Sequence, residues 1–253
     1  MGLKSAMKRT ITYANNFNSH ININEIKKRL ISKNVYSDKA IEEEISKLNW
    51  KNKKNKWQKI KIIKAKKLAS LINNKFGEIL FLGISGSVAA AHPKKNDDID
   101  MFIITKSNTL WKNRFFLRCW IFNKNIPHRK FNQTELKDQF CFNLWLDENC
   151  LEIPKSRQNL NNAMDLLLLL PLINKNNTYE KFLLANSWVK KFVATGYEQE
   201  IKKCLISKIL KNQINKNILR EITNWFYFWP QYWYMKPKIL KEKIGLHQAF
   251  FHR

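Results

Sequence analysis

An apolar segment followed at once by a glycine–serine pair constrains this chain more than any other feature. Residues 78–85 read EILFLGIS, which is typical of a buried β-strand, and Gly86 and Ser87 follow directly. The small residues 88–91 then predict the start of a helix. Glycine lets the backbone approach another group closely, and the first turn of a helix presents unpaired N–H groups. This strand–turn–helix pattern is therefore suited to holding an anion such as phosphate.

Two aspartates open the next apolar segment, DIDMFIIT at 98–105. Side chains alternate along a strand, so Asp98 and Asp100 are predicted to share one face, roughly 6.5–7 Å apart at the backbone, with Ile99 on the other face. Two carboxylates at this spacing repel each other unless a cation or a base neutralises them, and together they suit a hard cation such as Mg²⁺. Asp97 is expected to lie in the preceding turn and to point away.

The order of the remaining predicted elements favours an α/β (α+β) fold with a small mixed sheet. Helices are expected over 61–76 and 109–124, and a further strand over 139–147. From Asn159 onward helical periodicity dominates, so the C-terminal region is expected to be helical.

Three short helices are predicted within residues 8–50, with Asn24 and Ser37 as caps for two of them. The basic segment KNKKNKWQKIKII follows at 51–63. This layout fits a winged-helix-like module that could bind nucleic acid, and it fits a helical cap on the next domain equally well. The expected domains, in chain order, are a helical module at 1–60, a core at 61–158 and a helical region at 159–253.

The glycine–serine turn, a ten-residue spacer and the Asp-apolar-Asp-apolar strand together resemble the DNA polymerase beta-type nucleotidyltransferase superfamily. With NRFFLRCWIF and FCFNLWLDE downstream, the layout is similar to a poorly characterised prokaryotic branch of it. The resemblance implies that Gly86 and Ser87 bind the β- and γ-phosphates of ATP or another NTP. It also implies that Asp98 and Asp100 are catalytic and hold Mg²⁺ (or Mn²⁺), while a nucleoside monophosphate passes to a hydroxyl acceptor.

The sequence departs from that family at one position. Active members add a third carboxylate from a neighbouring strand, and the matching place in 139–147 holds Asn143, a neutral amide that cannot take a proton. Asp147 has the same strand parity but lies about 13 Å further along. Asp138 and Glu152 are further candidates at the strand ends. The alternative is therefore a non-catalytic nucleotide- or nucleic-acid-binding protein on a degenerate scaffold, and whether the chain is an enzyme stays open.

Several basic side chains could contact phosphate. His92 and the pair Lys94 and Lys95 follow the turn, and Arg114 and Arg118 stand four apart on a predicted helix. A surface histidine and solvated basic side chains are the simpler interpretations.

The charge of the whole chain points to polyanionic partners. Lys and Arg number 46 against 20 Asp and Glu, a net charge of +26, which favours RNA, DNA or nucleotides, although abundant Lys, Asn and Ile also fit codon drift. Eight aromatics lie in 224–238 around Pro230. They could stack on bases or sit at a membrane interface, but packing on the core is the preferred interpretation.

The cysteines carry no metal or disulfide pattern. They are scattered without a CxxC pair, at Cys119, Cys141, Cys150 and Cys204. The longest apolar run, 166–170, is far too short to span a bilayer, and no signal peptide is recognised. A cytoplasmic protein without a membrane span is expected. His247 and His252 are expected to be structural, and the acceptor and the oligomeric state are left open.

Overall fold

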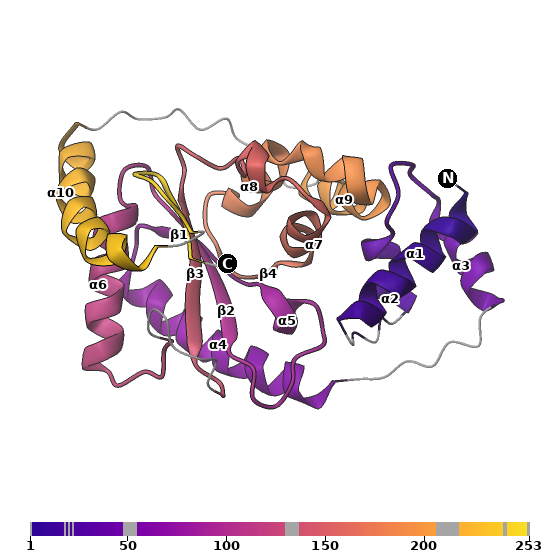
Figure 1. Ribbon diagram of the computed structural model, residues 1–253, viewed down its shortest axis with the longest axis horizontal. Helices are drawn as coiled ribbons and strands as arrows, with labels where there is room; N and C mark the ends of the chain where they lie inside the picture. The colour runs from indigo at the N-terminus through magenta and orange to yellow at the C-terminus, as the bar shows by residue number, and fades with distance from the viewer. Residues whose placement is uncertain are drawn as a thin grey trace.

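The computed structural model describes residues 2–17, 19, 21, 23–47, 55–129, 137–205, 218–239 and 242–251. Within them the chain forms a mixed sheet with helices against both faces (Figure 1). The predicted mixed α/β class is confirmed.

The sheet contains six described strands in the order β4-β1-β2-β3-β6-β5. Strands β2 and β3 run parallel, and every other neighbouring pair is antiparallel. The strands are β1 (Ile79–Ile84), β2 (Ile99–Thr105), β3 (Phe140–Asp147), β4 (Leu170–Asn174), β5 (Lys243–Ile244) and β6 (Gln248–Phe250).

The predicted helices are present, and Ser37 accepts a hydrogen bond from Ala40 N as a cap. No helix among the described residues combines the length and the apolar character needed to cross a membrane. The helices are α1 (Leu3–Asn16), α2 (Ile23–Arg29), α3 (Asp38–Ser46), α4 (Lys56–Lys75), α5 (Gly86–Ala89), α6 (Leu110–Asn123), α7 (Leu160–Leu168), α8 (Thr178–Ala185), α9 (Lys190–Leu205) and α10 (Ile218–Met235), with short 3₁₀ turns at Lys155–Arg157, Ser187–Val189 and Lys236–Lys238.

The two faces of β2 bury two separate apolar clusters. Ile99 and Met101 pack with side chains of α4, α6 and α10. Phe102 and Ile104 pack with side chains of α7, α8 and α9. This alternation confirms the predicted parity of the strand. Asp100, two residues before Phe102, therefore belongs to the face that α7–α9 cover.

The expectation that residues from 159 onward are helical is wrong for three segments, because β4, β5 and β6 all join the sheet. Pro171 explains β4: the residue before a proline avoids helical angles, so α7 ends at Leu168, and a proline is tolerated in an edge strand. Strands of two and three residues, such as β5 and β6, are too short to show a period.

Helices α1, α2 and α3 share an apolar cluster of their own that includes Met7, Ile26 and Ile41. Within the described part of residues 1–60 no named strand occurs, and Ser32 forms an isolated bridge with Val193 in α9. Residues 48–54, which include the start of the basic segment, lie outside the described residues. The winged-helix-like interpretation and the three domain boundaries stay predictions.

Candidate active site

The turn between β1 and α5 is shaped by Gly86. Its φ is +62°, a left-handed conformation that side chains other than glycine rarely adopt. A Cβ at this position would collide with the carboxylate of Asp100. Ser85 N also donates to the backbone oxygen of Asp100 at 3.0 Å. The predicted turn therefore lies directly against the second predicted aspartate.

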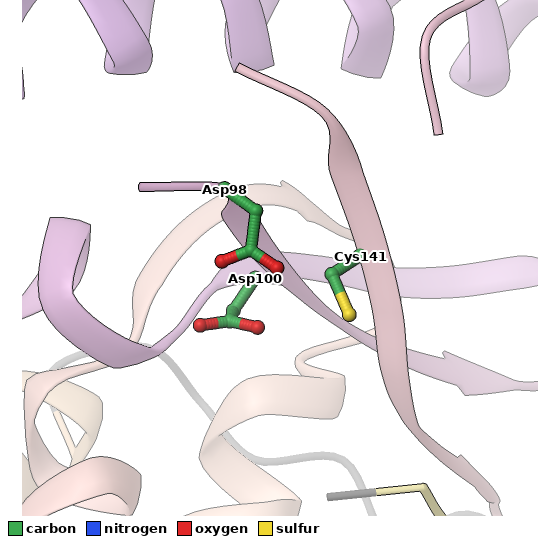
Figure 2. Close-up of side chains that lie close together, drawn as sticks. All are labelled: Asp98, Asp100 and Cys141. Atoms are coloured by element: carbon green, nitrogen blue, oxygen red, sulfur yellow. The ribbon is translucent and has the colours of Figure 1, made fainter. Parts of the chain in front are cut away.

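The two aspartates point to the same side, as predicted. Asp98, immediately before β2, is 5% exposed, and Asp100 in β2 is partly buried. Figure 2 shows both carboxylates together with the thiol of Cys141, which reaches them from the parallel strand β3. One ligand atom from each of the three residues lies within 4.8 Å of the others. The structure thus brings together the two aspartates that the sequence selected and adds Cys141, which the sequence did not indicate.

Each carboxylate has a nitrogen partner. Asp98 Oδ2 accepts from Arg129 Nη1 at 3.0 Å, and Asp100 Oδ1 accepts from Asn143 Nδ2 at 2.7 Å. Asn143 lies where the β2–β3 register shifts between Met101 and Phe102. The third position is therefore filled by an amide in direct contact with the site. Arg129 was missed, since no local sequence signal connects it to an aspartate 31 residues earlier.

Asp97 does not point away, so that expectation is wrong. Its Oδ2 accepts from Ser87 Oγ at 3.0 Å and from Lys94 N at 2.9 Å. The segment between Ser87 and Asp97 folds back on itself, and the spacing of residues could not predict this closure. Asp97 thereby orients the serine hydroxyl beside the cavity.

A buried lysine also holds the loop that contains Asp97. Lys61 is fully buried, and its Nζ donates to Asp97 O at 2.6 Å and to Asp138 Oδ1 at 2.8 Å. Burial raises the pKa of Asp138, but its hydrogen bonds to Lys61 and Lys64 outweigh this and lower the pKa overall. Asp138 therefore anchors the loop and does not supply the third carboxylate. In the sequence, Lys61 lies near the end of the basic segment at 51–63, and nothing there indicates that it is buried.

The alternative third carboxylates are not brought to the site. Asp147 is fully buried at the other end of β3, where it accepts from Asn149 N at 2.9 Å and pairs with His247 Nδ1 at 2.9 Å. That hydrogen bond raises the pKa of His247. Glu152 is exposed, beyond the end of the strand. His247 thus has the structural role expected for it, while His252 lies outside the described residues.

A cavity of about 980 Å³ opens beside the two aspartates. This volume lies at the upper end of the usual range for small-molecule sites and is ample for a nucleoside triphosphate. The turn, the aspartates and Asn143 form one wall. Further lining comes from α1, η1 (the 3₁₀ turn at Lys155–Arg157) and α7, and it includes the polar side chains of Tyr13, Arg157, Asn161, Asn162 and Asp165.

Two of the basic candidates line this cavity, namely His92 and Lys94. Burial, followed by the charge of Arg29, lowers the pKa of His92, so this ring is neutral at pH 7. Arg29 itself is buried and donates from Nη2 to Ala90 O at 2.7 Å. It thereby ties α2 to the end of α5.

The other three basic candidates stand elsewhere. Lys95 is exposed and does not line the cavity, and its Nζ lies 5.8 Å from the ring centroid of Trp57. Arg114 is buried between α6 and α10, where its Nη1 donates to Gln231 Oε1 at 2.5 Å. Arg118 is exposed on α6. Neither arginine lines the cavity, so neither is placed to bind phosphate there.

The donor atoms fit a hard cation. Burial, and then the charges of Asp100 and Asp98, raise the pKa of the Cys141 thiol far above its ordinary value. A protonated thiol is a poor ligand, so the two carboxylates are the groups that would hold Mg²⁺ or Mn²⁺. Cys119 and Cys150 are also free thiols, and the side chain of Cys204 lies outside the described residues.

Searches with this chain find no matching family model, no matching curated protein and no matching solved structure. Its function therefore has to be inferred from the geometry of the site.

Proposed function

We propose that this protein is a Mg²⁺-dependent nucleotidyltransferase that moves a nucleoside monophosphate from an NTP to a hydroxyl acceptor. The observation that supports this most directly is the contact between the Gly86 turn and the carboxylate of Asp100, with Asp98 beside it. A phosphate-binding turn and a cation-binding pair then face one cavity of nucleotide size.

The residues at the site have different roles in binding the phosphates and the cation. The backbone of Gly86 and the hydroxyl of Ser87 hold the β- and γ-phosphates. The hydroxyl has one proton, which is donated to Asp97 in the nucleotide-free protein, so it turns from Asp97 to the phosphate when nucleotide binds. Asp98 and Asp100 hold the cation, which when bound neutralises the phosphate oxygens and favours ionisation of the acceptor hydroxyl. Lys94 adds positive charge at the phosphate end of the cavity.

Arg129 competes with a cation for Asp98. Its guanidinium occupies one oxygen of that carboxylate, while its side chain is 30% exposed. A side chain with this exposure can move into solvent when an ion enters. Arg129 and Mg²⁺ are therefore alternative partners of Asp98.

A second candidate is nucleotide binding without turnover. Asn143 favours this second candidate, because its side-chain amide, which donates to Asp100, cannot accept the proton of an acceptor hydroxyl. In that case the turn and the cation pair would serve as a sensor or a carrier of nucleotide. The net charge of +26 favours RNA or a protein as the acceptor or partner over a neutral metabolite.

The test combines nucleotide binding with label transfer. The protein is incubated with each NTP labelled at the α-phosphate or, separately, at the γ-phosphate, with Mg²⁺ or Mn²⁺ and total cell RNA and protein. The test variant is Asp98→Asn with Asp100→Asn, which keeps the shape and removes the charges. Glu152→Gln is the matched control, since it removes an exposed carboxylate beyond the end of β3 that does not line the cavity.

Each outcome has one meaning. Transfer of α-label that disappears in the double variant and persists in Glu152→Gln supports the enzyme. Cation-dependent NTP binding without transfer, again lost in the double variant, supports the second candidate. Transfer of γ-label alone indicates a kinase, which contradicts both candidate functions. Absence of NTP binding also contradicts both candidate functions.

A further inference from the structure

The outer side of α10 exposes apolar residues along its whole length. Ile218, Leu219 and Ile222 are 71%, 76% and 60% exposed, and Trp225 and Trp233 further along are 54% and 58% exposed. The inner side is anchored by Phe228, whose ring packs 5.0 Å from that of Trp111. A helix that is apolar on both sides needs a second apolar surface to cover the outer one.

Helix α6 extends this exposed area. Phe115 and Phe116, 40% and 46% exposed, both pack against Tyr227 of α10, with centroids 5.3 and 5.5 Å away. Phe226, 64% exposed, adjoins Tyr227 at 5.6 Å. These rings and the exposed side of α10 form one continuous area, called here the α6–α10 surface. It lies at the end of the molecule opposite α1–α3 (Figure 1).

The exposed charges at the α6–α10 surface are mostly positive. The two helices carry four basic residues and a single acid, Glu221, but Arg114 is buried and Lys112 pairs with Glu78. Arg118 is exposed on α6 and interacts with Tyr234, and Lys236 Nζ lies 4.6 Å from the ring centroid of Trp233. An apolar area with tryptophan and tyrosine rings and a basic rim is complementary to the interface of an anionic bilayer.

Two other occupants fit less well. A second copy would bring one basic rim against another, and each copy carries a net charge of +26. Single-stranded nucleic acid stacks on aromatic faces, whereas Ile218, Leu219 and Ile222, which include the two most exposed residues of the surface, have no ring to stack on. Acyl chains accept aliphatic and aromatic side chains equally.

We propose that the α6–α10 surface binds the protein reversibly to membranes that contain anionic lipid, with α10 lying in the interface plane. The exposed apolar side chains enter the boundary between head groups and acyl chains, while Arg118 and Lys236 contact lipid phosphates. The cavity near Asp98 is lined by other elements and stays open to its substrate in this state. This proposal does not depend on the proposed nucleotidyl transfer.

The experiment uses the full chain with two kinds of vesicle, one of phosphatidylcholine alone and one with about one quarter phosphatidylglycerol. Co-sedimentation gives the partition coefficient, and quenching of tryptophan by brominated acyl chains reports insertion. The test variant is Trp225→Ser with Trp233→Ser, both at exposed positions. Val35→Ser, at a residue 57% exposed between α2 and α3, is the control for loss of an exposed apolar side chain.

The expected result is salt-sensitive binding to the anionic vesicles with quenching, and an about tenfold or larger loss of partition in the double variant at unchanged urea midpoint. Val35→Ser should bind like the natural sequence. The proposal is overturned if the unaltered chain does not bind anionic vesicles. It is also overturned if the double variant binds them as well as the unaltered chain, or if it loses only self-association or RNA binding.

Discussion

Gly86 and Asp100 touch so closely that the aspartate carboxylate occupies the space where any other residue at position 86 would place its Cβ. The contact links the turn after β1 to the start of β2. It explains why the glycine and the Asp-x-Asp strand have to occur together, although 12 residues lie between Gly86 and Ile99. The turn proposed to bind phosphate and the aspartates proposed to hold a cation are thus one structural unit.

Gly86→Ala should damage both stability and nucleotide binding. The left-handed φ alone costs about 1–2 kcal/mol for alanine, and the displaced Asp100 loses its place beside Asp98. Urea unfolding and equilibrium binding of NTP with Mg²⁺ measure the two effects. Gly77→Ala is the matched control, because nothing lies within 4 Å of a Cβ added there. Equal behaviour of the two variants would contradict the proposed role of Gly86.

Lys61→Met and Lys64→Met should differ strongly, although both lysines contact Asp138. Lys61 is fully buried and donates to both Asp138 and the backbone oxygen of Asp97, so its loss removes two buried charge-assisted hydrogen bonds at a cost of about 2 kcal/mol. Asp138 keeps Lys64 as a partner, and Asp97 O keeps the N–H of Asp138. The side chain of Lys64 is 45% exposed, and its loss should cost less than about 1 kcal/mol. Urea denaturation measures both. Similar costs would show that the loop does not depend on Lys61.

His247 should make stability depend on pH. The hydrogen bond to Asp147 raises its folded pKa above the ordinary value of 6.5. The stabilisation of the folded state by this interaction is therefore fully present below pH 6.5, and it is lost as the pH rises through the folded pKa. The histidine is about one-third exposed, so the effect should stay below about 1 kcal/mol. The midpoint of thermal unfolding, measured from pH 5.5 to 8.5, should show this loss in the natural chain and not in His247→Asn. If the midpoints of the two proteins change with pH in the same way, the predicted role of His247 is excluded.

The sequence predicted the parts of the fold whose signals are local. The strand parity of Asp98 and Asp100 and the Ser37 cap follow from residues within a few positions of each other. The glycine turn directly after an apolar strand is a local signal as well, although the contact that requires glycine there comes from Asp100. Strand β4 was missed because the leucine run continues through the point where Pro171 ends the helix.

The site was predicted less completely, because its remaining partners come from distant segments. Arg129 reaches Asp98 from beyond α6, and Lys61 reaches Asp97 from α4. Asn143 could be located because β3 was recognisable, but its contact with Asp100 depends on a shift of register that no residue pattern shows. Contacts of this kind are set by packing of the whole sheet.

Arg129→Gln should strengthen cation binding and lower the stability of the cation-free protein. The natural guanidinium neutralises Asp98, whose side chain is only 6% exposed, so its removal leaves that carboxylate unpaired. Thermal unfolding in EDTA should therefore show a lower midpoint than in the natural chain. Added Mn²⁺ should raise the midpoint more in the variant, because ion and arginine no longer compete. Arg118→Gln, on the exposed side of α6, controls for net charge. An equal response to Mn²⁺ in all three proteins would contradict the competition.

Asn143→Asp should restore a third carboxylate. The new group would lie beside Asp100, where Asn143 Nδ2 now donates at 2.7 Å, and like charges raise its folded pKa above the ordinary value of about 3.9. Without a cation, stability relative to the natural chain should therefore fall as the pH rises above about 4, and Mg²⁺ should restore it.

The same variant separates the two proposed functions. If the site transfers nucleotides, a base at position 143 should raise the rate of α-label transfer roughly tenfold or more, since general base catalysis contributes at least this much. If the natural chain only binds nucleotide, it should show no transfer of label, and the variant should gain cation affinity, with or without newly acquired transfer. Asn125→Asp, at an exposed residue after α6, carries the same charge change away from the cavity and should alter none of these quantities. A loss of stability at high pH that Mg²⁺ does not reverse would show that the two aspartates do not form a cation site.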